Sequence, residues 1–410
     1  MVEEDQAWPS LGYDDLLAAC SPGGSSVLSS VTELAPAGGQ HTSVAPAKFV
    51  DGSNSVFAYE RRFIDGEPLQ TAVIDSKQSQ LNRNEVTIQQ AIDDGHPVFG
   101  RVPLVQVVYE SDGESRIFTD LQLPHRAWDG HVRAGTVDGK PATSHPTYRA
   151  ARNATPANAK ALLEFSPGSL VFGSWDSTRR SNQSRYRSAL VGEIIGVLAE
   201  QDDRPPRSLR RGGARVDPVA MSVQLSGADL EELVTAQEAE LSPKLVAKIR
   251  KGAKGRGETA GSASELGLGG IPPSLNALGG VACRRIIRSH VLSFAALRQL
   301  RFGAGPDGDA AARALLAAYA LAGLARSEAE LCLRANCDLV EKEHPRVILD
   351  ERWGESRQLQ PLSIESADEL LAMAIDGAEH RAGVEWSGQR FVVQGNPVVL
   401  AAATSDEATP

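Results

Sequence analysis

The twelve residues 176–187 combine arginines with hydroxyl and amide side chains. They contain one acid, Asp176, and one bulky apolar side chain, Tyr186. The side chains suited to a sugar–phosphate backbone are Ser177, Arg179, Arg180, Asn182, Gln183, Ser184, Arg185 and Arg187. Arginine forks match phosphate oxygens, while hydroxyls and amides bond sugar and phosphate without reading sequence. The composition indicates a loop that grips nucleic acid, although a solvated surface loop would have the same composition.

The elements on either side of this loop must position it. Residues 169–175 alternate apolar and small side chains, which predicts a strand leading into the loop. A second apolar element follows the loop and ends near Val197. The expected unit is therefore a strand, a basic loop and a second apolar element.

A helix is predicted from Ser76 to Ile92, because Gly95 and Pro97 follow it as stop signals. Its apolar positions are Leu81, Ile88 and Ile92, spaced by seven and four residues. A second face is rich in amides and consists of Gln78, Asn82, Glu85 and Gln89. This face could hydrogen-bond a nucleic-acid backbone.

Other segments have simpler patterns. Extended structure is expected over 44–73 with turns at 51–52 and 65–66, a hairpin from 102–109 and 116–123, and loops over 130–160. Helices are predicted at 228–241, 281–302 and 310–324, and late strands at 346–350 and 390–401. Residues 13–19 form a short amphipathic segment, and 244–256 form a basic segment that leads into a Gly-rich loop. In the predicted helix 281–302, Arg284, Arg288 and Arg298 would lie within about 80° of one another.

Composition bounds the class of protein. The 410 residues include no apolar run of 18, and the acidic N-terminus lacks the regions of a signal peptide. Four scattered cysteines indicate reduced thiols and a cytoplasmic location. The net charge is −10, yet residues 179–301 hold 20 Lys and Arg against 12 Asp and Glu, leaving 22 against 40 elsewhere. Because the basic residues are concentrated in 179–301, the negative net charge does not exclude a nucleic-acid partner.

Common catalytic and cofactor motifs are missing from the sequence. It has no GxxxxGK[ST] phosphate loop, no GxSxG, no HExxH and no CxxC, and we expect neither a cofactor nor a metal. One GxGxxG, residues 303–308, follows a predicted helix and contains Pro306 and Asp307, so we interpret it as a connection between helices. His125 could act as a general base, but no acid or nucleophile is paired with it in the sequence.

Six short motifs in a fixed order give the chain a family resemblance. They are 75–83 (DSKQSQLNR), 123–126 (LPHR), 164–177 (EF…VFGSWDS), 266–273 (LGLGGIPP), 297–302 (LRQLRF) and 333–337 (LRANC). Together they resemble the guide-RNA-binding backbone subunit of the type I-U (also called I-G) CRISPR Cascade complex, in the RAMP superfamily. The resemblance extends from about residue 49 to residue 340.

The resemblance implies an α+β fold with a ferredoxin-like, RRM-type core and large insertions. One elaborated domain would span 1–410, with an N-terminal extension (1–46), a short thumb loop (176–187), a basic and Gly-rich insertion (201–280) and a helical segment (281–340). In this superfamily the thumb follows a strand that ends in Phe-Gly, which matches Phe172-Gly173. The first core helix, with its Asn-Arg pair, faces the guide.

The resemblance also implies partners: the CRISPR RNA, target DNA paired through that guide, copies of the chain itself stacked in a filament, and other Cascade subunits, with no membrane. A non-enzymatic role follows. The predicted RNA-binding residues are Lys77, Gln78, Ser79, Asn82, Arg83, His125, Arg126, Trp175, Ser177, Arg179, Arg180, Arg185, Arg187, Arg284, Arg285 and Arg288. Two alternatives stay open. One is a RAMP ribonuclease using His125 or Asp176, and the other is a protein–protein scaffold whose basic stretches are solvated.

Overall fold

The computed structural model describes residues 8–52, 54–111, 113–179, 185–201, 210–213, 223–268, 274–333 and 337–403. The chain forms two compact units. Unit 1 consists of Met1–Arg207 and Gly280–Val399, and unit 2 of Ser208–Gly279 and Leu400–Pro410. The predicted insertion, 201–280, overlaps most of unit 2.

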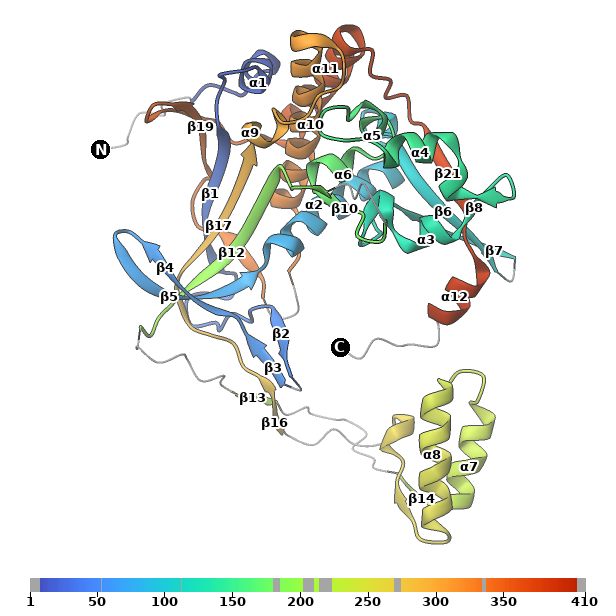
Figure 1. Ribbon diagram of the computed structural model, residues 1–410. Coiled ribbons are helices and arrows are strands. Elements are labelled where there is room, and N and C mark those ends of the chain that lie inside the picture. The colour runs from blue at the N-terminus through green and yellow to red at the C-terminus, as the bar shows by residue number, and fades with distance from the viewer. Residues whose placement is uncertain are drawn as a thin grey trace. The chain divides into compact units, whose positions relative to one another are not determined.

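An eight-stranded sheet forms the centre of unit 1 (Figure 1). Its order is β20-β19-β1-β17-β12-β5-β4, with β18 also beside β1. The strands are β1 (Val27–Pro36), β4 (Tyr59–Ile64), β5 (Glu67–Asp75), β12 (Leu190–Leu198), β17 (Cys283–Ser293), β18 (Leu339–Glu341), β19 (Arg346–Arg352) and β20 (Glu355–Leu359).

The four central strands have the ferredoxin-like order. Along the chain the core runs β1, α2 (Lys77–Asp93), β12, β17, α10 (Gly305–Ala329), β19, which is a βαββαβ unit. In the sheet the strands lie in the order β19-β1-β17-β12, that is fourth, first, third and second, and all neighbours are antiparallel. The predicted α+β, ferredoxin-like core is therefore confirmed, and β4, β5 and β20 extend it at its edges.

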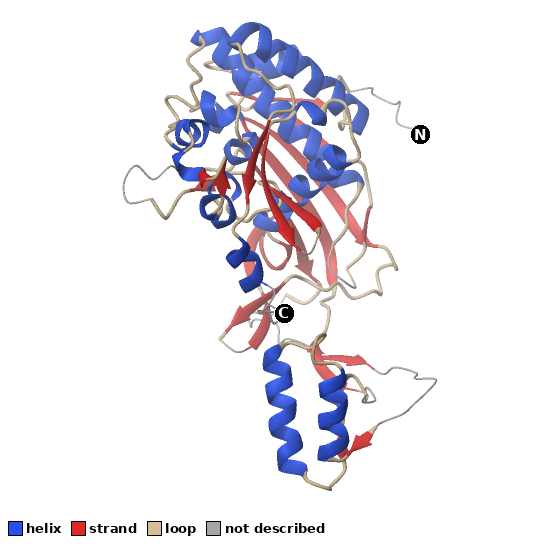
Figure 2. Ribbon diagram, turned by 90° about the vertical axis from the view of Figure 1, so that its right-hand side faces the viewer, coloured by secondary structure: helices blue, strands red, loops and turns tan. Residues whose placement is uncertain are grey.

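The helices cover one side of this sheet (Figures 1 and 2). Besides α2 and α10, the helices of unit 1 are α1 (Tyr13–Cys20), α3 (Gly130–Ala134), α4 (Pro146–Arg152), α5 (Lys160–Leu163), α6 (Pro167–Val171), α9 (Phe294–Leu297) and α11 (Ile364–Ala382), with α12 (Pro397–Ala403) near the C-terminus. Short 3-10 turns occur at Phe99–Arg101, Arg126–Trp128 and Ala142–Ser144. The helical prediction for 310–324 is confirmed in α10, which is longer at both ends.

A second sheet of unit 1 has the order β7-β6-β21-β8-β9. Its strands are β6 (Leu104–Ser111), β7 (Glu114–Thr119), β8 (Thr136–Val137), β9 (Lys140–Pro141) and β21 (Arg390–Gln394). The predicted hairpin is confirmed, since β6 and β7 pair from Gln106–Thr119 to Ser111–Glu114. Two hairpins, β2 (Lys48–Asp51) with β3 (Asn54–Phe57) and β4 with β5, confirm the extended structure expected over 44–73.

Helix α2 begins and ends as the sequence predicts. The Ser76 hydroxyl accepts a hydrogen bond from the Ser79 amide (3.3 Å) and caps the first turn. Leu81 and Ile88 are buried. Close packing against α10 depends on Gly323, because a Cβ there would lie 2.7 Å from Ile88 Cδ1.

The helix predicted over 281–302 is wrong. Residues 283–293 form β17, and only Phe294–Leu297 are helical. Burial alternates along the strand, so Ile286, Arg288, His290 and Leu292 face the helices. The helix prediction places the buried Arg288 on an arginine-bearing helical face, although alternation and β-branched residues favour a strand.

Two other predictions also fail in detail. Residues 167–171 form α6 instead of a strand, and the strand that follows is only β10 (Ser174–Trp175). All five residues of α6 are buried, so its sequence has no amphipathic period to indicate a helix. The region 130–160 contains helices as well as loops, and 397–403 forms α12 where a strand was expected.

A buried polar network joins β17 to the helices. His290 Nδ1 lies 3.0 Å from Glu328 Oε1, and its Nε2 lies 3.0 Å from Gln80 Oε1. Arg288 Nη2 donates to Thr32 Oγ1 (3.3 Å). Burial alone would raise the pKa of Glu328, but the hydrogen bond from His290 and the charge of Arg288 outweigh it, and the pKa lies below its usual value.

Gly192 on β12 leaves room for the His290 ring. A Cβ at this position would overlap the ring, so we expect Gly192→Ala to lower the free energy of unfolding by about 1–3 kcal/mol. Denaturant unfolding measures the effect. Gly100→Ala is the control, because nothing lies within 4 Å of its Cβ position. Equal stability of the two variants would contradict the role given to this glycine.

Unit 2 contains a helical hairpin with its own core. Its elements are β13 (Arg210–Gly213) paired with β16 (Ser274–Leu278), β14 (Gln224–Leu225) paired with β15 (Gly261–Ser262), α7 (Gly227–Ala236), α8 (Pro243–Arg256) and a 3-10 turn at Ser264–Leu266. The buried core consists of Leu230, Val234, Val246, Ile249 and Ala253. The helix predicted over 228–241 is confirmed in α7, which ends five residues early, and the basic segment 244–256 lies within helix α8.

Candidate nucleic-acid interface

The predicted thumb begins as a short β-hairpin. Ser174 pairs with Tyr186 and Trp175 with Arg185, so β10 and β11 (Arg185–Tyr186) form its stem. The chain enters the stem through Gly173, at φ +85°, where a Cβ would lie 2.9 Å from the Ser188 amide nitrogen. Glycine is needed there for both reasons. Residues 180–184, with Arg180, lie outside the described residues.

The stem presents an aromatic ring beside cationic side chains. Trp175 is 53% exposed, and the guanidinium carbon of Arg185 lies 5.4 Å from its ring centroid. Arg187 is exposed two residues further on. An exposed indole can stack on a base, and the arginines can contact the adjacent phosphates. Here the structure brings together three of the predicted residues.

Two other described residues of the thumb, Asp176 and Arg179, form contacts at its base. Asp176 is buried and pairs with Arg152, with Nε to Oδ2 at 2.7 Å. Arg179 donates to the Arg152 carbonyl (2.8 Å) and to Asn153 Oδ1 (2.5 Å). Burial would raise the pKa of Asp176, yet the Arg152 hydrogen bonds hold it below its usual value. No sequence pattern predicts that Arg152 pairs with Asp176, because the two residues are 24 positions apart.

The first core helix exposes part of its predicted face. Lys77, Gln78 and Asn82 are exposed and Ser79 is half-buried. The amide-rich face is split, because Glu85 and Gln89 are buried. Of the predicted RNA-binding residues on α2, Lys77, Gln78 and Asn82 are therefore the ones most exposed to a ligand.

The Arg83 side chain forms hydrogen bonds with other residues of the protein. Its Nε donates to Asp75 Oδ2 (3.0 Å), and Asp75 also accepts from Gln80 Nε2 (2.6 Å). Arg83 also donates to the Cys332 carbonyl. An alanine substitution here would disturb a buried carboxylate, so Lys77 is the cleaner probe of this surface.

We expect Lys77→Ala to weaken RNA binding about equally for unrelated sequences. Loss of one lysine–phosphate contact should reduce the slope of log affinity against log salt by roughly 0.7 for a single strand. Fluorescence anisotropy with two unrelated RNAs measures both quantities. Lys140→Ala, also exposed, is the control. A loss confined to one RNA would mean base readout.

The LPHR motif lies at the root of the thumb. His125 is exposed, whereas Arg126, at φ +48°, points its guanidinium inward. Both Glu85 oxygens accept from Arg126 (2.5 and 2.7 Å), and so does the Gly173 carbonyl (2.8 Å). Arg126 thus ties α2 to the first residue before the hairpin, a structural role that the sequence analysis missed.

The three arginines of β17 do not share a face. Arg284 is exposed. Arg285 pairs with Glu33 (2.9 Å) and Asp65 (2.7 Å). Arg288 is 1% exposed and pairs with Glu341 (2.6 Å). Of these, only Arg284 combines exposure with a charge that no described acid neutralises.

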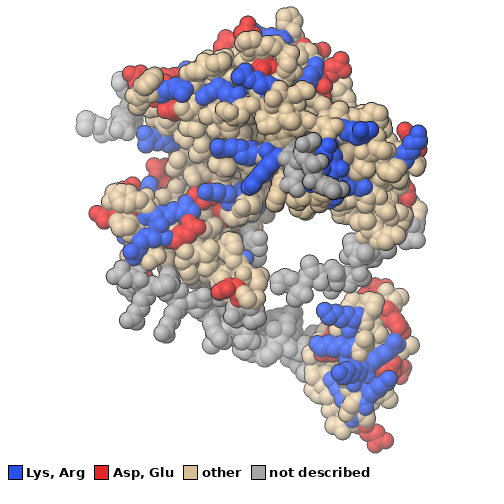
Figure 3. Space-filling model, viewed as in Figure 1, with Lys and Arg blue, Asp and Glu red and all other residues tan. Residues whose placement is uncertain are grey.

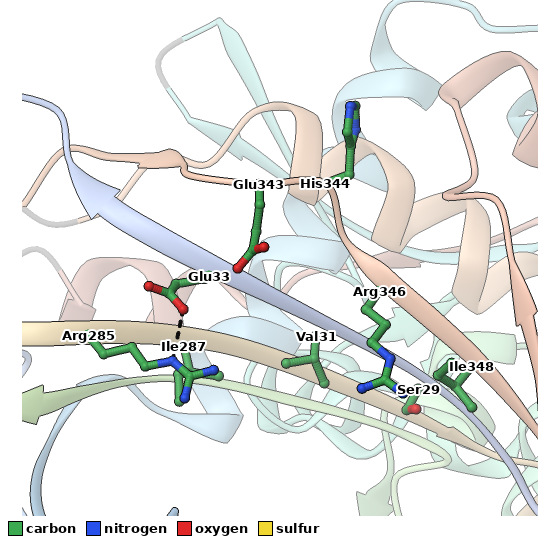
Figure 4. Close-up of a pocket in the computed structure, with 9 residues that line it drawn as sticks. All are labelled: Ser29, Val31, Glu33, Arg285, Ile287, Glu343, His344, Arg346 and Ile348. Atoms are coloured by element: carbon green, nitrogen blue, oxygen red, sulfur yellow. Dashed lines mark hydrogen bonds and ion pairs between the residues drawn. The ribbon is translucent and has the colours of Figure 1, made fainter. Parts of the chain in front are cut away.

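The open side of the large sheet has a hollow of about 500 Å³ (Figure 4). It is lined by Ser29, Val31, Glu33, Arg285, Ile287, Glu343, His344, Arg346 and Ile348. Hydrogen bonds from Lys342 and Arg285 hold the pKa of Glu33 below its usual value. RRM sheets bind bases through exposed aromatic side chains, and this lining contains no Phe, Tyr or Trp; Arg285, which lines it, is paired with Glu33. The hairpin side of unit 1 is therefore the better candidate.

Positive charge gathers on that side. Figure 3 shows Lys and Arg side chains over α2, α3 and α4, the elements that surround the hairpin stem. Arg133 belongs to this group and donates to the Trp128 carbonyl and to Thr178 Oγ1, both at 2.9 Å. The geometry suits sequence-independent contact with a single strand, through a stacking platform and surrounding cations.

Residues 28–201 match the family model described as CRISPR-associated protein GSU0053. The match covers 174 of the 410 residues and supports a CRISPR-associated protein. The matched segment runs from β1 to just beyond β12 and includes α2, the LPHR motif and the hairpin stem. No curated protein matches the chain.

Within the described part of the chain, no helix is both long and apolar enough to cross a bilayer.

Proposed function

We propose that the chain binds guide RNA as the backbone subunit of a type I-G (I-U) Cascade, assembles with copies of itself along the guide and presents it to target DNA. The observation that carries this proposal is the CRISPR-associated match across the segment that contains the basic hairpin stem. The six sequence motifs add the narrower resemblance to that subunit.

The geometry of the hairpin supports RNA over duplex DNA at this site. Trp175 is more than half exposed, and Arg185 lies against its ring, so the stem can stack on an unpaired base. Exposed Lys77, Gln78 and Asn82 can bond phosphate and sugar without reading sequence. A subunit that holds different guides requires this indifference to sequence, since base pairing then selects the target.

The first test is whether the purified chain carries RNA. We expect an absorbance ratio at 260 and 280 nm typical of a nucleoprotein and extracted RNA of defined length. A chain that purifies free of nucleic acid and binds no added RNA would overturn the proposal and favour the protein–protein scaffold.

The second test removes the stacking platform. Trp175→Ala with Arg185→Ala and Arg187→Ala should weaken RNA binding roughly tenfold or more, since stacking contributes about 1–3 kcal/mol per base. Arg116→Ala with Lys140→Ala is the control, because both side chains are exposed on other elements. Equal RNA retention by all three proteins would refute the placement of the interface at the hairpin.

A non-enzymatic role is part of this proposal. Asp176 is held in an ion pair with Arg152, which leaves it poorly placed to act as a free acid or base. We expect no cleavage when labelled RNA is incubated with the chain, with or without divalent cations. Cutting that His125→Ala abolishes would favour the ribonuclease alternative.

A further inference from the structure

Helix α8 of unit 2 has a lysine stripe along one side. Lys244, Lys248, Lys251 and Lys254 are exposed and lie within about 120° of the helix circumference at 100° per residue. The buried residues Val246, Ile249 and Ala253 lie on the opposite side, against α7. The fold of unit 2 therefore directs all four lysines to solvent.

Most of this charge is not neutralised by unit 2. Lys248 pairs with Glu265 (3.0 Å), and Arg250 is held by Glu231 (2.7 Å) and Glu238 (2.8 Å). No described acid pairs with Lys244, Lys251 or Lys254, which form the free part of the stripe. Residues 223–268 hold six basic and seven acidic side chains, so segregation of charge, not net charge, creates the positive surface (Figure 3).

Small residues lie among the lysines. Gly252 and Gly255 have nothing within 4 Å of their Cβ positions, and Ala247 is exposed beside them. Glycine inside a helix costs about 1 kcal/mol relative to alanine. No packing requirement explains either glycine, but a smooth surface lets a phosphate backbone come close to the helix.

The composition of unit 2 favours a double-stranded nucleic acid over a single strand as its ligand. Residues 208–279 contain no Phe, Trp, Tyr or His. Proteins that hold single strands stack bases on aromatic rings, as Trp175 can in unit 1. Lysines bind phosphate as point charges, and the stripe has no arginine, asparagine or glutamine to form a planar, bidentate contact with a base edge. The stripe therefore fits the outside of a duplex better than an unpaired strand.

The geometry points to a second nucleic-acid site: the α8 lysine stripe binds the phosphate backbone of double-stranded DNA without sequence preference. It goes beyond the proposed guide-binding function, because it assigns a different nucleic acid to a different unit. Lys244 and Lys251 are seven residues apart, about 10.5 Å along the helix, and Lys254 extends the row by about 4.5 Å. The stripe is long enough to contact several phosphates.

The test uses the full chain and a labelled duplex of about 30 base pairs in roughly 50–200 mM salt. Lys244→Ala with Lys251→Ala and Lys254→Ala should weaken duplex binding roughly tenfold or more and reduce the salt slope by about 2.7, at 0.9 per lysine. The control, Lys48→Ala with Arg116→Ala and Lys140→Ala, removes the same charge from unit 1 and should bind as the unchanged protein does.

Each other outcome has a definite meaning. Unchanged duplex binding by the α8 variant overturns the inference, and so does a loss of carried RNA or of a protein partner without a loss of duplex binding. A wild-type chain that purifies without RNA and binds no added RNA, but still binds duplex through α8, refutes the proposed guide-binding function and leaves this inference standing. Alanine is a strong helix former, so thermal melts should show that α8 remains folded.

Discussion

Replacing Arg126 by alanine is expected to lower the free energy of unfolding by about 3–5 kcal/mol, because it leaves Glu85 buried without its partner. Glu85 is 3% exposed and accepts both of its ion-pair hydrogen bonds from Arg126. The substitution also removes the donor to the Gly173 carbonyl at the root of the hairpin. Denaturant unfolding of the full chain measures the loss.

The partner substitution separates charge burial from packing. Adding Glu85→Gln to Arg126→Ala removes the uncompensated charge and should recover part of the lost stability. Arg116→Ala, at an exposed position, is the matched control for loss of one arginine. If Arg126→Ala were as stable as the unchanged protein but had lost RNA binding, Arg126 would be an RNA-binding residue, as the sequence predicts.

The effect of Arg126→Ala should depend on pH. Burial raises the pKa of Glu85, and Arg126 offsets part of that rise. Without Arg126 the folded-state pKa rises further, so folded Glu85 keeps its proton to a higher pH than unfolded Glu85 does. The destabilisation should therefore be smaller at pH 5 than at pH 8.

Local signals were enough to predict several individual helices and hairpins. Helix α2 has a serine cap, stop signals and an amphipathic period, and the β6–β7 hairpin has a polar turn between two apolar runs. These features depend on neighbours in sequence, and the structure agrees with them. The ferredoxin-like strand order was expected from the resemblance, because pairing across the sheet has no local signal.

The failures have a common cause in tertiary partners. Arg288 and His290 are acceptable inside the sheet because Glu328, Gln80 and Thr32 meet them from distant segments. Sequence cannot reveal such partners, so β17 was predicted to be a helix with an arginine face. In α6 every residue is buried, and the period that distinguishes a helix from a strand is lost.

The sequence predicted which residues gather at the candidate site better than it predicted what each of them does. Trp175, Arg185 and Arg187 gather at the stem, and Lys77, Gln78 and Asn82 are exposed on α2. Several predicted arginines instead neutralise buried acids, because a buried carboxylate requires a nearby cation. Which arginine is free depends on where the acids fall in three dimensions.

Asp120→Asn is expected to change how stability depends on pH. Asp120 is 1% exposed, and its oxygens accept hydrogen bonds from the Val105 amide (3.1 Å) and the Ser166 hydroxyl (2.5 Å). Burial raises its pKa from 3.8 to about 7, although these hydrogen bonds lower it. Between about pH 4 and 7 the folded chain therefore keeps a proton that the unfolded chain has released. Over this range the free energy of unfolding falls as pH rises, with a slope of up to one bound proton.

Asparagine imitates the protonated acid, since its oxygen can accept from Val105 while its amide donates to Ser166. Relative to the unchanged protein, Asp120→Asn should be similarly stable near pH 4 and more stable near pH 8, by a difference on the order of 4 kcal/mol. Unfolding curves at several pH values measure this difference, with Asp94→Asn as the control for loss of an exposed carboxylate. Parallel pH profiles for the unchanged protein and Asp120→Asn would show that Asp120 is ionised in the folded chain across this range. The Ser166 and Val105 donors would then be sufficient to hold a buried charge in the core of unit 1.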